Sequence, residues 1–257
     1  MAASRRIVLL GGGFSTDPDT LLDDFVLRAA GRERPGVCFL PTASGDAQGY
    51  IDRFHDVLGG RGDCGTVHLP LFRRTDADLR SLILSQDVVY VGGGSTANLL
   101  ALWRLHGLDE ILREAYASGV LLCGISAGAC CWFQGCLTDS FGPLRPLADG
   151  LGLLPGSLCP HYDSEPGRRC GYRSALAAGA LPGGWALDDG AAALFVDGHL
   201  AEAVTRKEGA SLHRVVTDAA AGGCAVREEA LPARLLTARG PGPTAGPGAP
   251  TAAITSP

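Results

Sequence analysis

Long hydrophobic runs and an excess of basic residues are both missing from this sequence of 257 residues. No apolar stretch is long enough to span a bilayer, and the first apolar segment ends at Gly11, too early for a secretory signal. The 22 Lys and Arg residues face 27 Asp and Glu, so the net charge of -5 disfavours a partner held through neutralised phosphates. We therefore expect a cytoplasmic protein that binds neither membranes nor nucleic acid.

Paired cysteine motifs are also missing, although the chain has nine cysteines. They form no C-x-x-C pair and have no histidine at the spacing of a zinc site, so we expect reduced thiols and no metal. The glycine turn 11–13 does not match the G-x-G-x-x-G motif of dinucleotide-binding proteins, because Ser15 and Thr16 stand where the third glycine after Gly11 and Gly13 belongs. We expect no cofactor.

What the first half of the chain does have is an alternation of short apolar strands with helical segments. Strands are predicted at 6–10, 37–40, 66–71 and 87–91, and helices at 20–30, 50–58, 97–105 and 108–116. This alternation predicts an α/β fold with a mostly parallel sheet flanked by helices on both faces. Ligands of such sheets bind at the carboxyl ends of strands, where the glycine-rich turns 11–13 and 92–94 fall.

The second half of the chain has a different pattern. A strand ending at a histidine is predicted at 158–163, a helix at 169–176, and further strands at 184–187, 191–196, 200–204, 212–216 and 235–236. Turn signals at 188–190 and 197–198 suggest an antiparallel meander as a C-terminal extension. The segment 135–156 is polar and rich in glycine. We expect a single domain at 1–238 and a disordered Gly/Pro/Ala-rich tail at 239–257.

The chain is organised around Gly124-Ile125-Ser126-Ala127-Gly128, which follows an apolar strand and precedes a predicted buried helix. This pattern matches the G-x-S-x-G nucleophile elbow, in which a serine sits on a strained turn at the end of a strand. The glycines leave room for backbone that a Cβ would obstruct, and the helix start favours an anion beside the serine. The alternative interpretation is a tight strand-to-helix turn without chemistry.

A nucleophilic serine needs a base, which in turn needs an orienting acid. His161 is the best candidate base, because it follows an apolar run and precedes polar residues. Asp189, at the end of a predicted strand, is the first candidate acid, and Asp163, Glu165 and Asp139 remain open. Each of these could instead be a solvated loop carboxylate.

Acyl transfer also requires donors for the oxyanion. The N–H of Ala127, directly after the serine, is one candidate, and the glycine turn around Gly93 supplies a second. The turn could also be a plain loop before a helix capped by Ser95 or Thr96.

Three stretches together resemble the peptidase E family of serine peptidases. They are Gly92-Gly93-Gly94-Ser95-Thr96-Ala97-Asn98-Leu99-Leu100, Gly124-Ile125-Ser126-Ala127-Gly128-Ala129 and Pro160-His161-Tyr162. The resemblance covers roughly residues 5 to 215. It implies a fold similar to class I glutamine amidotransferases, with Ser126 as the nucleophile and His161 as the base. Where the family typically has a glutamate before a glycine, this chain has the shorter acid Asp189.

The resemblance also implies a substrate. Aspartyl dipeptidases of the family hold the substrate carboxylates with basic residues, and Arg168, Arg169 and Arg173 lie where such a residue could sit. Asn98, Asp139 and Arg169 are the substrate-binding residues that we predict. The loop 163–167 is shorter than in the best-known aspartyl dipeptidases.

The sequence therefore predicts a serine peptidase that cleaves dipeptides or short peptides, with a preference for an N-terminal Asp. Alternatives are a cyanophycinase-like or other amide or ester hydrolase, and a catalytically silent member that binds a small ligand. A glutaminase is disfavoured, because that chemistry uses cysteine where this chain has Ser126. The expected partner is a small peptide substrate, and the oligomeric state stays open, with a homodimer as one option.

Overall fold

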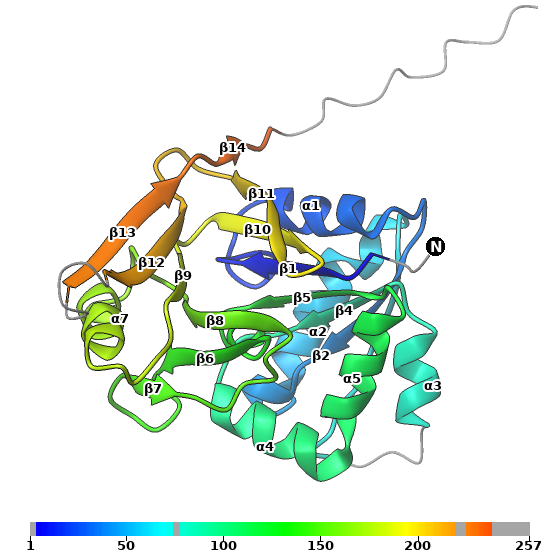
Figure 1. The fold of residues 1–257 in the computed structure, drawn as a ribbon. Coiled ribbons are helices and arrows are strands. Elements are labelled where there is room, and N and C mark those ends of the chain that lie inside the picture. The colour runs from blue at the N-terminus through cyan, green and yellow to red at the C-terminus, as the bar shows by residue number, and fades with distance from the viewer. Residues whose placement is uncertain (1–3, 74–77, 219–224, 238–257) are drawn as a thin grey trace, which may run out of the picture.

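The computed structural model describes residues 4–73, 78–218 and 225–237, which fold around two sheets (Figure 1). The first sheet has eight strands in the order β14-β11-β10-β1-β5-β4-β2-β3. These strands are β1 (Arg6–Leu10), β2 (Gly36–Leu40), β3 (Gly65–His68), β4 (Val88–Val91), β5 (Leu121–Ile125), β10 (Ala191–Val196), β11 (His199–Thr205) and β14 (Arg234–Leu235). Its centre, from β1 to β3, is parallel, whereas β10 runs antiparallel to both β1 and β11.

Helices cover both faces of the first sheet. They are α1 (Leu21–Ala30), α2 (Gln48–Val57), α3 (Leu79–Leu84), α4 (Thr96–His106) and α5 (Leu108–Ala117), with short 3-10 turns η1 (Thr42–Ser44) and η2 (Gly59–Arg61). Alternate residues of each strand point to opposite faces, so Val8 and Leu10 pack with α1 and α2, and Ile7 and Leu9 pack with α3, α4 and α5. The predicted α/β fold is confirmed, and its apolar strands are buried on both faces as parallel sheets require.

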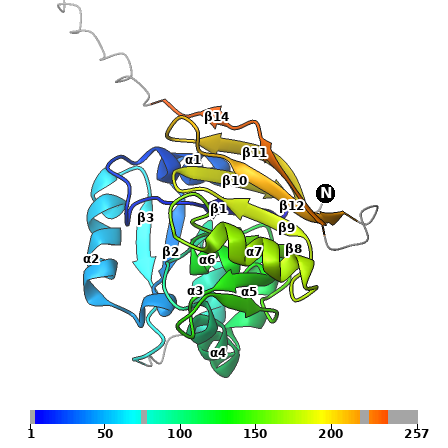
Figure 2. The ribbon, with the colours of Figure 1, turned by 90° about the vertical axis from the view of Figure 1, so that its left-hand side faces the viewer.

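The second sheet has six strands in the order β13-β12-β9-β8-β6-β7. They are β6 (Phe133–Thr138), β7 (Arg145–Leu147), β8 (Leu154–Cys159), β9 (Gly184–Leu187), β12 (Leu212–Asp218) and β13 (Ala225–Leu231). One face packs into the core beneath α4 and α5, and the other is covered by α7 (Arg168–Ala177), which Figure 2 shows lying across it. The antiparallel extension is therefore present, but it is divided between two sheets.

One expectation about this half is wrong. The predicted meander fails at residues 188–190, where the chain crosses from β9 in the second sheet to β10 in the first. The sequence patterns also do not reveal β13, nor the strands within the glycine-rich segment 135–156, which holds most of β6, all of β7 and the start of β8. Turn residues mark a change of direction but do not say which strand pairs with which.

The remaining expectations concern termini, thiols and membranes. The predicted tail at 239–257 lies outside the described residues. The eight cysteines within the described part of the chain are free thiols, seven of them buried. Among the residues that the structure describes, no helix is both long and apolar enough to cross a bilayer.

Candidate active site

Ser126 sits on a strained turn between β5 and the four-residue helix α6 (Ala127–Cys130). Its φ of 54° and ψ of -111° place a non-glycine residue in a region that L side chains avoid. A Cβ on Gly124 would lie 2.1 Å from the carbonyl oxygen of Gly128, and a Cβ on Gly128 would lie 2.3 Å from that of Val91. The two glycines thus let β4, β5 and α6 approach closely. The helix is shorter than expected, because Phe133 already begins β6.

The structure brings Ser126, His161 and Asp189 into one hydrogen-bonded chain. The Nε2 atom of His161 lies 2.9 Å from Ser126 Oγ, and Nδ1 lies 2.7 Å from Asp189 Oδ1. His161 follows β8 and also has a positive φ of 54°, and the N–H of Tyr162 is fixed to the carbonyl of Leu187. The His161 ring is thus held between the carboxyl ends of β5, β8 and β9.

The four candidate acids have different partners. Asp163 accepts the backbone N–H of Asp189 at 2.8 Å and lies 3.4 Å from Lys207 Nζ. Glu165 and Asp139 lie 2.7 and 3.7 Å from the buried Arg168 guanidinium. Of these four carboxylates, Asp189 is the one that hydrogen-bonds to the His161 ring.

The charge on Asp189 is favoured by its surroundings. Burial by itself would raise the pKa of this carboxyl, but hydrogen bonds with His161 and Ser164 and the positive charge of Lys207 outweigh burial. The pKa of Asp189 therefore lies below its usual value, and the carboxylate is ionised at neutral pH. A carboxylate there accepts the Nδ1–H of the ring and leaves Nε2 free to accept a proton from Ser126.

The two candidate oxyanion donors differ in their surroundings. Ala127 is the first residue of α6, where N–H groups have no acceptor within the helix. Gly93 lies beside the serine, since a Cβ on it would be 3.5 Å from Ser126 Cβ, but its N–H donates to Tyr50 Oη at 3.2 Å. Ser95 does cap α4, accepting the N–H of Asn98.

The three predicted substrate-binding residues lie on three separate segments: α4, the residue after β6, and α7. Asn98 lines an exposed groove with Phe72 and other residues of α4, and Asp139 pairs with Arg168. Arg169 is exposed and bonds to Glu228 of β13 at 2.7 Å. The hydrogen bonds and ion pairs of the described residues link none of these three to Ser126 or His161.

A cavity of about 240 Å³ adjoins the histidine and contains residues that the sequence did not single out. His161 and Asp189 line it together with the glycine turn after β1, Asp17, Arg206 and Lys207. Arg206 is bound by Asp19 at 2.6 Å, whereas Lys207 is held by Asp163 at 3.4 Å and its side chain is 43% exposed. No local pattern marks these positions, because they meet through strands far apart in the sequence.

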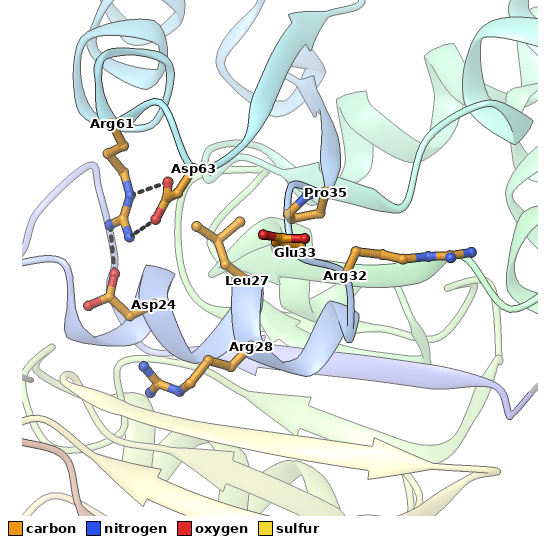
Figure 3. A pocket seen from close by; sticks show the side chains of 8 residues that line it. All are labelled: Asp24, Leu27, Arg28, Arg32, Glu33, Pro35, Arg61 and Asp63. Atoms are coloured by element: carbon orange, nitrogen blue, oxygen red, sulfur yellow. Dashed lines mark hydrogen bonds and ion pairs between the residues drawn. The ribbon is translucent and has the colours of Figure 1, made fainter. Parts of the chain in front are cut away.

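A larger pocket of about 410 Å³ lies along α1, between it and η2 (Figure 3). Arg61 lies 2.6 Å from Asp24 and 2.9 Å from Asp63, so much of the charge there is already paired. Figure 3 shows Arg28 and Arg32 pointing away from each other. This pocket has no nucleophile among its lining residues.

The fold and this arrangement define a class: α/β proteins that carry a Ser-His-Asp chain on a sharp turn at the carboxyl edge of a parallel sheet. The chain belongs to peptidase family S51, whose family model matches residues 7–204. The predicted family is thereby confirmed, and the protein is a peptidase by family.

Individual relatives agree with this family. The chain is 50% identical over 211 residues to the uncharacterized peptidase YgaJ of Bacillus subtilis, covering 82% of this chain and 91% of that protein. It is 33% identical over 138 residues to peptidase E of Streptomyces coelicolor, covering 51% of this chain and 53% of that one. Among solved structures, a peptidase from an acI-B1 actinobacterium is similar in fold, with a TM-score of 0.64 at 17% identity over 90% of this chain and 95% of that chain.

Proposed function

We propose that this protein is a serine peptidase that hydrolyses dipeptides or short peptides through an acyl-enzyme. The observation that carries the proposal is the unbroken chain from Ser126 Oγ through the His161 ring to the Asp189 carboxylate. A serine hydroxyl becomes nucleophilic when a positioned base takes its proton, and the acid behind the ring stabilises the imidazolium that forms.

The steps follow from this geometry. Ser126 Oγ attacks the peptide carbonyl while its proton passes to Nε2 of His161, and the oxyanion is stabilised by the N–H of Ala127. His161 returns the proton to the leaving amine as the C–N bond breaks. Water then attacks the acyl-enzyme with His161 again as base, which releases the acid and restores Ser126.

The cavity beside His161 supports a small substrate. Its volume of about 240 Å³ is on the scale of one or two residues. Two basic side chains line the cavity. Arg206 is paired with Asp19 and Asp17, whereas Lys207 is held more loosely by Asp163, and it is Lys207 that supports a preference for an acidic first residue. In this proposal Lys207 takes the place that the sequence had suggested for Arg169.

A two-part experiment tests the proposal. A fluorophosphonate probe should label the wild-type protein at Ser126 and should leave Ser126→Ala unlabelled. A panel of dipeptides differing in the first residue should then show turnover by wild type, fastest for Asp, and loss of turnover in Ser126→Ala and His161→Ala. Labelling without any dipeptide turnover would point to an ester or other amide substrate, and absence of labelling would point to a silent binder.

A further inference from the structure

The glycine turn that follows β4, residues 92–94, is held in place by contacts on both of its sides. The N–H of Gly92 donates to the carbonyl of Leu40 at 3.1 Å, and the N–H of Ser95 donates to that of Ala43 at 2.8 Å. Gly93 lies between these two anchored residues, and its N–H donates to the hydroxyl of Tyr50 at 3.2 Å. Because glycine has the widest choice of backbone conformations, the middle of such a turn needs an anchor if it is to keep one orientation.

Tyr50 is itself rigidly placed. Its ring packs against Phe14 and Phe39, with centroid distances of 5.3 and 5.1 Å. A Cβ on Gly92 would lie 2.8 Å from Tyr50 Cε1, so the ring lies directly against the turn. A ring wedged in this way cannot swing aside easily, and the hydroxyl is a fixed feature of the turn.

The hydroxyl also has the protonation state that this contact requires. Burial raises the pKa of Tyr50 above its usual value, against the opposing effect of the hydrogen bonds with Gly93 and Ser15. The neutral phenol therefore accepts the Gly93 N–H through its oxygen, and the Ser15 hydroxyl also hydrogen-bonds with it.

The orientation of Gly93 matters because of its distance from the nucleophile. A Cβ on Gly93 would be 3.5 Å from Ser126 Cβ and 3.6 Å from the carbonyl oxygen of Ile125. A reoriented Gly93 peptide would therefore press on Ser126 or withdraw from it, and would move Ser126 Oγ relative to His161. A nucleophile reacts at its full rate only when it is already held in the geometry of attack.

We propose that Tyr50 is a positioning residue for the nucleophile, whose hydroxyl fixes the Gly93 peptide against Ser126. This inference rests on the proposed serine chemistry but adds a residue that neither the elbow motif nor the Ser-His-Asp chain contains. In the opposite arrangement Tyr50 competes with the substrate for the Gly93 N–H, and removal of its hydroxyl would then raise the rate of Ser126 labelling instead of lowering it.

The test is Tyr50→Phe, which removes the hydroxyl and keeps the ring that packs on Phe14, Phe39 and Gly92. The measurement is the second-order rate of Ser126 labelling by a fluorophosphonate, which requires no knowledge of the natural substrate. We expect this rate to fall about fivefold to tenfold, the loss of one aligned hydrogen bond. Thermal unfolding, measured in parallel, should shift by no more than in the control.

Tyr172→Phe is the matched control, because it also deletes a hydrogen-bonded tyrosine hydroxyl, one that bonds to Ser157 on the far side of the second sheet at 2.7 Å. It should cost comparable stability without slowing the labelling. A Tyr50→Phe protein that labels at the wild-type rate or faster overturns the inference and leaves the proposed function standing. A wild-type protein that takes no label overturns both.

Discussion

Asp189 is the residue whose negative charge the proposed reaction needs most directly. It lies 2.7 Å from His161 Nδ1, and its own backbone N–H is fixed by Asp163. The ion pair between Asp163 and Lys207 brings a positive charge close to Asp189, so the acid is both placed and kept ionised. Sequence reasoning identified Asp189 from the glycine that follows it, but it could not find Asp163 as a support, because that contact spans 26 residues.

We expect Asp189→Asn to lower the rate of Ser126 labelling and of peptide turnover by roughly a thousandfold or more. The amide leaves the shape of the site intact but can donate to Nδ1, which favours the ring tautomer with its proton on Nε2, facing the serine. Labelling rate and thermal unfolding should be measured together, and the folded state should survive.

Asp139→Asn is the control for this substitution, because its carboxylate faces Arg168 rather than the ring. It should retain most of the wild-type rate. If Asp139→Asn is inactive while Asp189→Asn stays near wild type, the orienting acid has been assigned to the wrong residue.

At the scale of elements, the continuous apolar strands of the first sheet were predictable, and several strands of the second were not. Gly135 in β6 and Gly156 in β8 look like loop residues in the sequence. In the structure a Cβ on Gly135 would lie 2.8 Å from the carbonyl oxygen of Leu147, and one on Gly156 would lie 2.5 Å from that of Gly183. In these strands the close packing of the backbone requires glycine, the residue that usually interrupts a strand. The alternating, mostly exposed β13 has no apolar run to reveal it.

The elbow offers a prediction at the same scale. Gly128→Ala should destabilise the fold by about 1–3 kcal/mol and slow Ser126 labelling, because its Cβ would meet the backbone oxygen of Val91 in β4, which cannot move aside without distorting the sheet. Gly49→Ala is the matched control. It lies exposed in α2 with nothing within 4 Å of the added Cβ, and it should leave stability unchanged or raise it by up to about 1 kcal/mol. Urea unfolding of both variants measures the difference, and equal stabilities would contradict the close approach of β4 and α6.

For the whole molecule, the first sheet separates two cores, and the core beneath α1 and α2 contains a buried acid. Asp23 of α1 is fully buried and accepts the hydroxyl of Tyr90 at 2.9 Å. Burial raises the pKa of Asp23 to about 7, which the hydrogen bond with Tyr90 only partly offsets. The apolar pattern of α1 predicted the helix, but it gave no sign that an acid would sit on its buried face.

This acid should make the free energy of unfolding depend on pH. Between the usual pKa near 3.8 and the folded value of about 7, the folded chain holds a proton on Asp23 that the unfolded chain has released. The contribution is therefore present in full below the unfolded pKa and is lost as the pH rises through about 7, with a slope of up to about 1.4 kcal/mol per pH unit. Asp23→Asn cannot titrate but keeps an oxygen for Tyr90, so wild type should lose stability relative to this variant between pH 5 and 7. Urea unfolding of both proteins at several pH values isolates the effect, since all other titrating groups are shared, and a stability difference that does not change with pH would show that Asp23 is ionised in the folded protein.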